Sequence, residues 1–271
     1  MSQSDQAKSS LVRRTVAVLR AVARRPDGLG LSDVSKVSGI PKATCLRILQ
    51  VLEEERLIRM DEGSKRYVLA LGIIGLASPV LSEGSGIAML QNELTQLAAD
   101  TGETSGLDIL EGGKVVVLLE SPSPQLISQA PKPVPRSLPV FNTSTGKALA
   151  AHQPESMLKT LLGDRGPTEV RRILEELERV RTSGLSQAVD ELEEGAAAIA
   201  CPVIVDGVAI CAVWIGGPTF RFSENAIGSM AKRLRASTKD IGGILRASPR
   251  LLAGHGRLTP ADTEASPSRL P

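Results

Sequence analysis

Apolar residues recur with a helical period near the N-terminus. From Leu11 onward one stripe repeats every three or four positions, with arginines on the other faces, and it consists of Val12, Val16, Leu19 and Ala23. Pro26-Asp27-Gly28 predicts the turn that ends this helix. A second, short helix is predicted over residues 33–38, with Ser32 as its N-cap and Gly39 as its stop.

A third helix is predicted to open at Pro41, where a missing N–H costs little. On a helical wheel its apolar residues gather on one side, which we expect to face a core: Cys45, Ile48, Leu49 and Leu52. Ala43, Arg47 and Gln50 point the opposite way, and Thr44 and Leu46 flank them. The helix therefore has one buried stripe and one stripe free to meet a partner.

Two short alternating runs, 57–60 and 65–69, surround a Gly-containing turn and predict a β-hairpin. Three helices followed by a hairpin is the order of a winged helix-turn-helix, which we place at residues 9–72. Residues 70–82 predict a linker helix broken by Pro79, so a linker is assigned to 73–83.

A second domain is expected over residues 84–246, helical up to Gly102. Strands are predicted over 103–110, 115–119, 196–205 and 208–216, the last two around an Asp206-Gly207 hairpin signal. Between them lie a Pro-rich loop over 122–139 and helices over 145–151, 154–162 and 167–183. A last helix covers 223–245, and the tail 247–271 has the composition of a disordered segment.

The three cysteines form no CxxC pair and no disulfide framework. Cys201 and Cys211 flank the Asp206-Gly207 turn. A two-residue turn would place them on opposite faces of the sheet, and a three-residue loop would place them directly across from each other. Either way we expect two buried thiols, and Cys45 is expected to face the core of its own domain.

Charge divides unevenly along the chain. Residues 1–77 carry 13 Lys and Arg against 8 Asp and Glu, while the remainder carries 19 against 22. A basic first third is typical of a nucleic-acid module, although a solvated basic helix would show the same balance. Residues 1–10 have no apolar signal-peptide core, and the apolar stretch 68–81 is too short to span a bilayer. We expect a cytoplasmic protein that does not enter the membrane.

The third helix supplies the candidate DNA contacts. Arg47 can bond a guanine in two places, and Ala43 or Leu46 can meet a thymine methyl. Lys42 and the first-turn N–H groups suit phosphate. The full set of predicted DNA-binding residues is Ser32, Lys36, Lys42, Ala43, Thr44, Leu46, Arg47, Gln50 and, on the hairpin, Lys65 and Arg66. Each of these charges could instead be a solvated surface group.

Two other classes of protein compete with a DNA-binding regulator. An enzyme would need catalytic groups, yet the chain has only two histidines and none of the HExxH, GxSxG or dinucleotide-binding patterns. Gly146-Lys147 does not complete a phosphate-binding loop, because Ala148 follows and Phe141 stands at the first glycine. A protein-interaction module without DNA affinity would share the fold without needing Lys42 and Arg47. No metal or cofactor is expected.

The ordered motifs resemble the IclR family of transcriptional regulators. The N-terminal matches are 31–34 (LSDV), 39–44 (GIPKAT), 47–49 (RIL) and 67–72 (YVLALG). The C-terminal matches are 101–104 (TGET), 145–149 (TGKAL), 190–195 (DELEEG) and 215–218 (IGGP). The resemblance implies an α+β chain: a winged helix-turn-helix followed by a GAF-like α/β effector-binding domain with an antiparallel sheet. It also implies homodimers or tetramers on near-palindromic double-stranded operators, a small organic effector, and regulation with repression as the favoured mode.

The resemblance also implies the place of the effector pocket. The matching positions are Ser144, Thr145 and Gly146 on one side and Ala188, Asp190, Ala198 and Trp214 on the other. Backbone N–H groups of the Ser144-Thr145 turn could hold an anion. Ala188, Ala198 and Trp214 stand where members that bind small organic acids tend to have polar residues. Two alternatives follow: Trp214 closes the pocket as core, or it forms the aromatic wall for a larger, more apolar effector.

Overall fold

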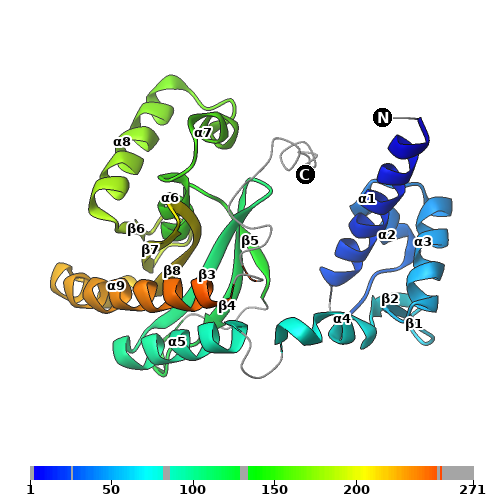
Figure 1. Ribbon diagram of the computed structural model, residues 1–271, viewed down its shortest axis with the longest axis horizontal. Coiled ribbons are helices and arrows are strands. Elements are labelled where there is room, and N and C mark those ends of the chain that lie inside the picture. Colours follow the sequence, from blue (N-terminus) through cyan, green and yellow to red (C-terminus); the bar gives the residue numbers. More distant parts are fainter. Residues whose placement is uncertain (1–2, 26, 82–85, 129–133, 249–250, 252–271) are drawn as a thin grey trace. The chain divides into compact units, whose positions relative to one another are not determined.

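The computed structural model, drawn in Figure 1, describes residues 3–25, 27–81, 86–128, 134–248 and 251. The chain divides into two units, Met1–Ser82 and Glu83–Pro271. Within the described ranges, no helix is both long enough and apolar enough to cross a membrane. Several predictions fall outside these ranges: Pro26, the start of the second domain at Gly84, Pro131 and Pro133 of the loop, and residues 249–250 and 252–271 of the tail.

The first unit contains three helices, a two-stranded hairpin and a fourth helix. Its elements are α1 (Gln3–Ala23), α2 (Leu31–Ser38), α3 (Lys42–Glu54), β1 (Ile58–Asp61), β2 (Arg66–Leu69) and α4 (Gly72–Leu81). The two strands are antiparallel, and Leu29 adds a bridge to Tyr67 at the hairpin's edge. A core of side chains from α1, α2, α3 and β1, including Val22, Val34 and Leu49, holds the unit together. The predicted winged helix-turn-helix is confirmed.

The apolar stripe of α1 is confirmed as helical, but most of it lies outside the core of this unit. The helix begins at Gln3 rather than near Leu11, and its buried residues are Val18, Ala21 and Val22. Val12 and Val16 are 64% and 42% exposed. Because valine and alanine occur around most of this helix, the sequence carries two possible apolar faces. The face that packs against α2 and α3 is the one centred on Val18 and Val22.

Two local predictions in the first unit are also corrected. Ser32 is not an N-cap, because α2 begins at Leu31, two residues earlier than predicted. The extended residue Gly30 takes the N-cap position, and its carbonyl accepts from the N–H groups of Asp33 and Val34. Pro79 does not break the linker helix, since α4 runs through it to Leu81. The proline lacks the N–H that would bond the carbonyl four residues earlier, yet the helix continues for two residues beyond it.

The second unit is built on one antiparallel sheet of six strands in the order β5-β4-β3-β8-β7-β6. The strands are β3 (Thr104–Glu111), β4 (Lys114–Ser121), β5 (Arg136–Leu138), β6 (Ser186–Val189), β7 (Ala196–Val205) and β8 (Val208–Pro218). The helices are α5 (Gly86–Thr101), α6 (Ser144–Ala150), α7 (Glu155–Leu162), α8 (Pro167–Ser183) and α9 (Glu224–Ala247), with a 3₁₀ turn at η1 (Thr219–Arg221). An α+β chain with an antiparallel sheet was predicted and is confirmed.

The sheet separates two layers of helices. Helices α5 and α9 (orange) pack side by side on one face, while α6 packs on the other and carries α8 beyond it (Figure 1). Successive residues of β8 alternate accordingly: Val213 and Ile215 join the core beneath α5 and α9, and Ala212 and Trp214 face α6. This strand period of two therefore places Trp214 on the α6 side.

The edge strands β5 and β6 were missed, and both are short. Strand β5 has three residues within the Pro-rich segment, and β6 has four, two of them exposed. Runs of three and four residues are too short to show a repeating hydrophobic pattern in the sequence. Tertiary pairing with β4 and β7 is what makes them strands.

The cysteine pair follows neither predicted arrangement. The turn has two residues, Asp206 and Gly207, both with positive φ, but the β7–β8 register shifts between Val203 and Ile204. This bulge pairs Cys201 with Val213 and Cys211 with Val203, so both thiols point into the same core, two positions apart. Burial raises the pKa of the Cys201 thiol to about 11, so the pair consists of unreactive buried thiols, as expected.

Candidate functional site

The first candidate site is the outer face of α3. Helix α2 ends in the left-handed residue Gly39, with φ of 69°. The Ser35 hydroxyl donates to the carbonyl of Ile40 at 2.6 Å, and the Cys45 thiol donates to the same oxygen at 3.3 Å. These bonds anchor the turn between α2 and α3 and fix the direction in which α3 leaves it.

Helix α3 has one buried face and one exposed face, as its sequence predicts. The four residues of the predicted apolar stripe are buried: Cys45, Ile48, Leu49 and Leu52. Lys42, Ala43, Leu46, Arg47 and Gln50 are exposed, and Thr44 is half-buried. The helix therefore presents one arginine, one lysine and one glutamine to solvent from a rigid element, while a packed stripe fixes its rotation.

The remaining predicted DNA contacts also lie at the surface of this unit. Ser32 and Lys36 are exposed on α2, and Lys65 and Arg66 are exposed at the hairpin turn. The hairpin is tied to the body of the unit because the Met60 N–H donates to the Glu53 carboxylate of α3 at 2.8 Å. All ten residues are thus accessible on one folded unit.

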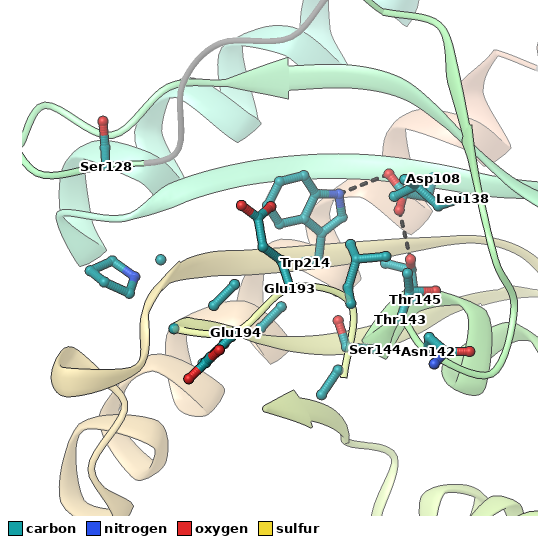
Figure 2. A pocket seen from close by; sticks show the side chains of 18 of the residues that line it. Asp108, Ser128, Leu138, Asn142, Thr143, Ser144, Thr145, Glu193, Glu194 and Trp214 are labelled. Carbon is teal, nitrogen blue, oxygen red and sulfur yellow. Dashed lines mark hydrogen bonds between the residues drawn. The ribbon is translucent and has the colours of Figure 1, made fainter. Parts of the chain in front are cut away.

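The second candidate site is a cavity of about 380 Å³ on the α6 side of the sheet. Figure 2 shows its labelled side chains converging from β3, β8, α6 and the loop that precedes β7. Five of the seven predicted effector residues line it: Ser144, Thr145, Ala188, Ala198 and Trp214. Trp214 forms one wall of an open space, so the alternative in which it closes the pocket does not hold for this structure.

Gly146 and Asp190 do not line the cavity. A side chain at Gly146 would begin 2.0 Å from the Val140 carbonyl oxygen, so this glycine serves the packing of α6. The Asp190 carboxylate accepts from the Gly195 N–H at 2.7 Å and holds the turn between β6 and β7. Both residues shape the surroundings of the cavity without facing it.

A buried carboxylate stands beside Trp214. The indole N–H donates to Asp108 Oδ1 at 2.8 Å, and the Thr145 hydroxyl donates to Oδ2 at 2.6 Å (Figure 2). Trp214 is paired with Gly106 of β3, and a side chain there would lie 2.5 Å from the indole. Because Gly106 has no side chain, the indole ring of Trp214 has room to lie over β3.

Burial governs the charge of Asp108. Removal from water raises its pKa to about 7, against the lowering effect of the Thr145 and Trp214 donors and of the Arg136 charge. Arg136 forms an ion pair with Glu120, which offsets part of its influence. The expected ligand anion at Ser144-Thr145 thus meets a carboxylate that the protein itself places against Thr145.

A buried lysine holds the loop beside the cavity. Lys147 of α6 is 1% exposed, and its Nζ donates to Glu176 of α8 and to Glu191 at 2.7 Å each. Asn142 Nδ2 donates to the Glu191 carbonyl at 3.2 Å. Because residues 192–198 line the cavity just after Glu191, this ion pair fixes one wall of the pocket.

Several lining residues were not predicted from the sequence, among them Asp108, Arg136, Asn142 and the loop acids Glu193 and Glu194. A signal existed for Asp108, which is the one charged residue within the run 104–110. A charge inside an otherwise buried strand commonly marks a site. Within the described ranges, no group of three His, Cys, Asp or Glu residues could hold a metal ion.

Known proteins share both units. Residues 11–62 match the IclR helix-turn-helix domain, and residues 80–242 match the C-terminal domain of bacterial IclR transcriptional regulators. The chain is 28% identical over 214 residues to the HTH-type transcriptional regulator TtgV of Pseudomonas putida, covering 74% of this chain and 80% of TtgV.

Solved structures give the same result. The IclR-type regulator of Silicibacter sp. TM1040 is 25% identical, with a TM-score of 0.74 over 93% of this chain and 99% of the other. An IclR homologue from Microbacterium hydrocarbonoxydans, solved with 4-hydroxybenzoate, has a TM-score of 0.71 at 23% identity over 88% of this chain and all of that chain (100%).

A helix-turn-helix with an exposed basic face, joined to a ligand-sized cavity in a separate unit, defines a DNA-binding transcription regulator rather than an enzyme. The chain belongs to the IclR family.

Proposed function

We propose that this regulator is a repressor that binds an operator through α3 and releases it when a small organic effector fills the cavity beside Trp214. The observation that carries the proposal is the pairing of the two sites in one chain. Unit one exposes Arg47 from a helix with a packed inner face. Unit two keeps an aromatic-walled cavity of about 380 Å³, within the size range of small-ligand sites. The cytoplasm, where the operator lies, is the proposed place of action.

Base recognition is assigned to the exposed face of α3. Arg47 would bond a guanine in two places, while Ala43 and Leu46 would contact thymine methyl groups. Gln50 extends the same face, and Thr44 and Lys42 lie nearer the phosphates at the start of the helix. Ser32, Lys36, Lys65 and Arg66 would add backbone contacts from α2 and the hairpin.

The test is a gel shift against the DNA upstream of the protein's own gene. Arg47→Ala should weaken operator binding by about 1–3 kcal/mol and relax one base preference. Lys65→Ala should weaken binding to all DNA sequences alike and reduce the slope of log affinity against log salt concentration by about one. Arg172→Ala removes an exposed arginine from α8 in the second unit, so it is the matched control. Binding by Arg47→Ala equal to that of the parent would contradict the assignment.

Effector control is assigned to the cavity. Trp214, Leu138, Ala188 and Ala198 supply apolar walls, which favour an aromatic ligand over a short keto acid. A ligand at about 100 times its Kd should add roughly 2.7 kcal/mol of stability. Thermal shift and operator binding would be followed with 2-phenylethanol, 4-hydroxybenzoate and pyruvate. A shift and operator release with pyruvate alone would refute the aromatic pocket.

Assembly as a homodimer, with pairing to a tetramer as the further step, is assigned to apolar residues that the first unit leaves exposed. Leu11, Val12 and Val16 on α1 are exposed, as are Ile74 and Leu76 on α4. Two copies would match a near-palindromic operator. Light scattering should give at least a dimer, and Leu76→Glu should shift it toward monomer. Leu174→Glu on exposed α8 is the matched control, and a monomeric parent at micromolar concentration would refute the assembly.

A further inference from the structure

The charged side chains that line the cavity are mostly acidic. Asp108 is 2% exposed beside Trp214, and Glu193 and Glu194 lie in the loop before β7. Among the described residues, the one basic residue of the lining is Arg136, and its guanidinium is ion-paired with Glu120. A carboxylate ligand entering this space would therefore meet three acidic side chains and an arginine that already has an acidic partner.

Most uncharged side-chain donors of the cavity wall already donate hydrogen bonds within the protein. The Trp214 indole N–H and the Thr145 hydroxyl both donate to Asp108, and Asn142 Nδ2 donates to a backbone carbonyl. The Thr143 hydroxyl donates to the carbonyl of Pro139. What the wall offers a ligand is chiefly acceptor capacity, because each Asp108 oxygen has a lone pair beyond the one in use.

Ser144 and Ser128 are the exceptions, since neither side chain has a hydrogen-bond partner in the described part of the chain. Ser144 is the more buried of the two, at 3% exposed. Figure 2 shows its hydroxyl directed into the space between α6 and Trp214. The hydroxyl is accessible from the cavity, so a ligand group can pair with it by displacing water. A hydroxyl can both donate and accept, so it fits an alcohol or an amine equally well.

The cavity is large enough for an aromatic ligand. A cavity of about 150 Å³ suffices for benzene, so about 380 Å³ accommodates an aromatic ring together with further groups. Trp214 provides the flat wall against which such a ring can stack.

From these contacts we infer that the effector is an aromatic compound whose polar group donates hydrogen bonds and carries no negative charge, an amine or an alcohol, and that the cavity rejects the corresponding carboxylate. This inference rests on the proposed function, because it assigns a ligand class to the effector cavity. This ligand class differs from the anion that the sequence led us to expect at the Ser144-Thr145 turn. The Thr145 hydroxyl there already donates to the Asp108 carboxyl group.

The test compares three probes of matched shape: 2-phenylethylamine, 2-phenylethanol and phenylacetate. Trp214 is the chain's only tryptophan, so indole emission of the full-length protein without DNA reports directly on this cavity. We expect saturable changes with the amine and the alcohol, the amine being tighter, and at least a tenfold weaker Kd for phenylacetate. Tighter binding of phenylacetate, or no binding of any of the three at millimolar concentration, would overturn the inference.

Two variants assign the selectivity to named residues. Asp108→Asn keeps the size of the side chain and cannot ionise. At pH 8, above the pKa of Asp108 at about 7, the variant should therefore bind the amine about tenfold more weakly and phenylacetate more tightly than the parent does. Ser144→Ala should weaken both the amine and the alcohol several-fold, and it keeps the inference testable if Asp108→Asn fails to fold. Unchanged selectivity in both variants would contradict the assignment.

A separate arm measures operator binding with and without each probe. If the amine binds the cavity and operator affinity does not change, the proposed effector control fails while the ligand class stands. If phenylacetate binds and releases the operator, effector control stands and the ligand class fails.

Discussion

Asp108 makes the stability of the second unit depend on pH in an unusual direction. A carboxylate paired with cations is stabilised as an anion, whereas Asp108 is buried and its pKa rises from 3.8 to about 7. Its ionisation therefore costs more free energy in the folded state than in the unfolded state. The folded state binds more protons than the unfolded state between these two values, so the contribution of Asp108 to stability falls as pH rises through that window.

The magnitude follows from the shift. Each pKa unit corresponds to about 1.36 kcal/mol, so the cost of ionising Asp108 in the folded state reaches about 4 kcal/mol above neutral pH. About 3 kcal/mol of it develops between roughly pH 5 and pH 8, because the unfolded carboxyl is already largely ionised at pH 5. Asp108→Asn has no such charge, and its amide can still accept from the Trp214 indole.

The assay is urea unfolding followed by Trp214 emission, at about pH 5 and pH 8, for the parent and Asp108→Asn. As pH rises from 5 to 8, the free energy of unfolding of the variant should increase by about 3 kcal/mol relative to that of the parent. Asp164→Asn, at an exposed site of the same unit, is the matched control and should show no comparable change. A stability difference between Asp108→Asn and the parent that does not vary with pH would refute the reasoning, whatever its absolute size.

Two further substitutions test the walls of the cavity. Lys147→Met removes the buried cation between Glu176 and Glu191. Because these two acids are 25% and 34% exposed, water replaces part of the lost ion pairing, and thermal unfolding should show a loss of stability of about 1–3 kcal/mol. Lys159→Met, at an exposed ion pair, is the control. Gly106→Ala places a methyl 2.5 Å from the indole, so it should cost about 1–3 kcal/mol and shift the tryptophan emission, whereas Gly243→Ala meets nothing within 4 Å and should do neither. A silent Lys147→Met or Gly106→Ala would show that these contacts do not support the pocket.

The sequence alone determined the elements whose signals are local. The two faces of α3 follow from a helical period with one apolar stripe, and the Asp206-Gly207 turn follows from residues that accept positive φ. The same holds for the order of helices and hairpin in the first unit. In the second unit, the strong strands β3, β4, β7 and β8 are long enough to show their apolar character without their partners.

Tertiary structure decided what depends on contacts between distant segments. The face of α1 that packs, the edge strands β5 and β6, and the register shift that turns Cys201 and Cys211 to one side all arise from pairing that no single segment encodes. The pocket is the clearest case. Asp108, Thr145 and Trp214 are separated by up to 106 residues, and only the pairing of β3 with β8 beneath α6 places the carboxyl between its two donors. Its burial, and with it the raised pKa and the acceptor character of the cavity, exists only once the sheet and α6 have packed.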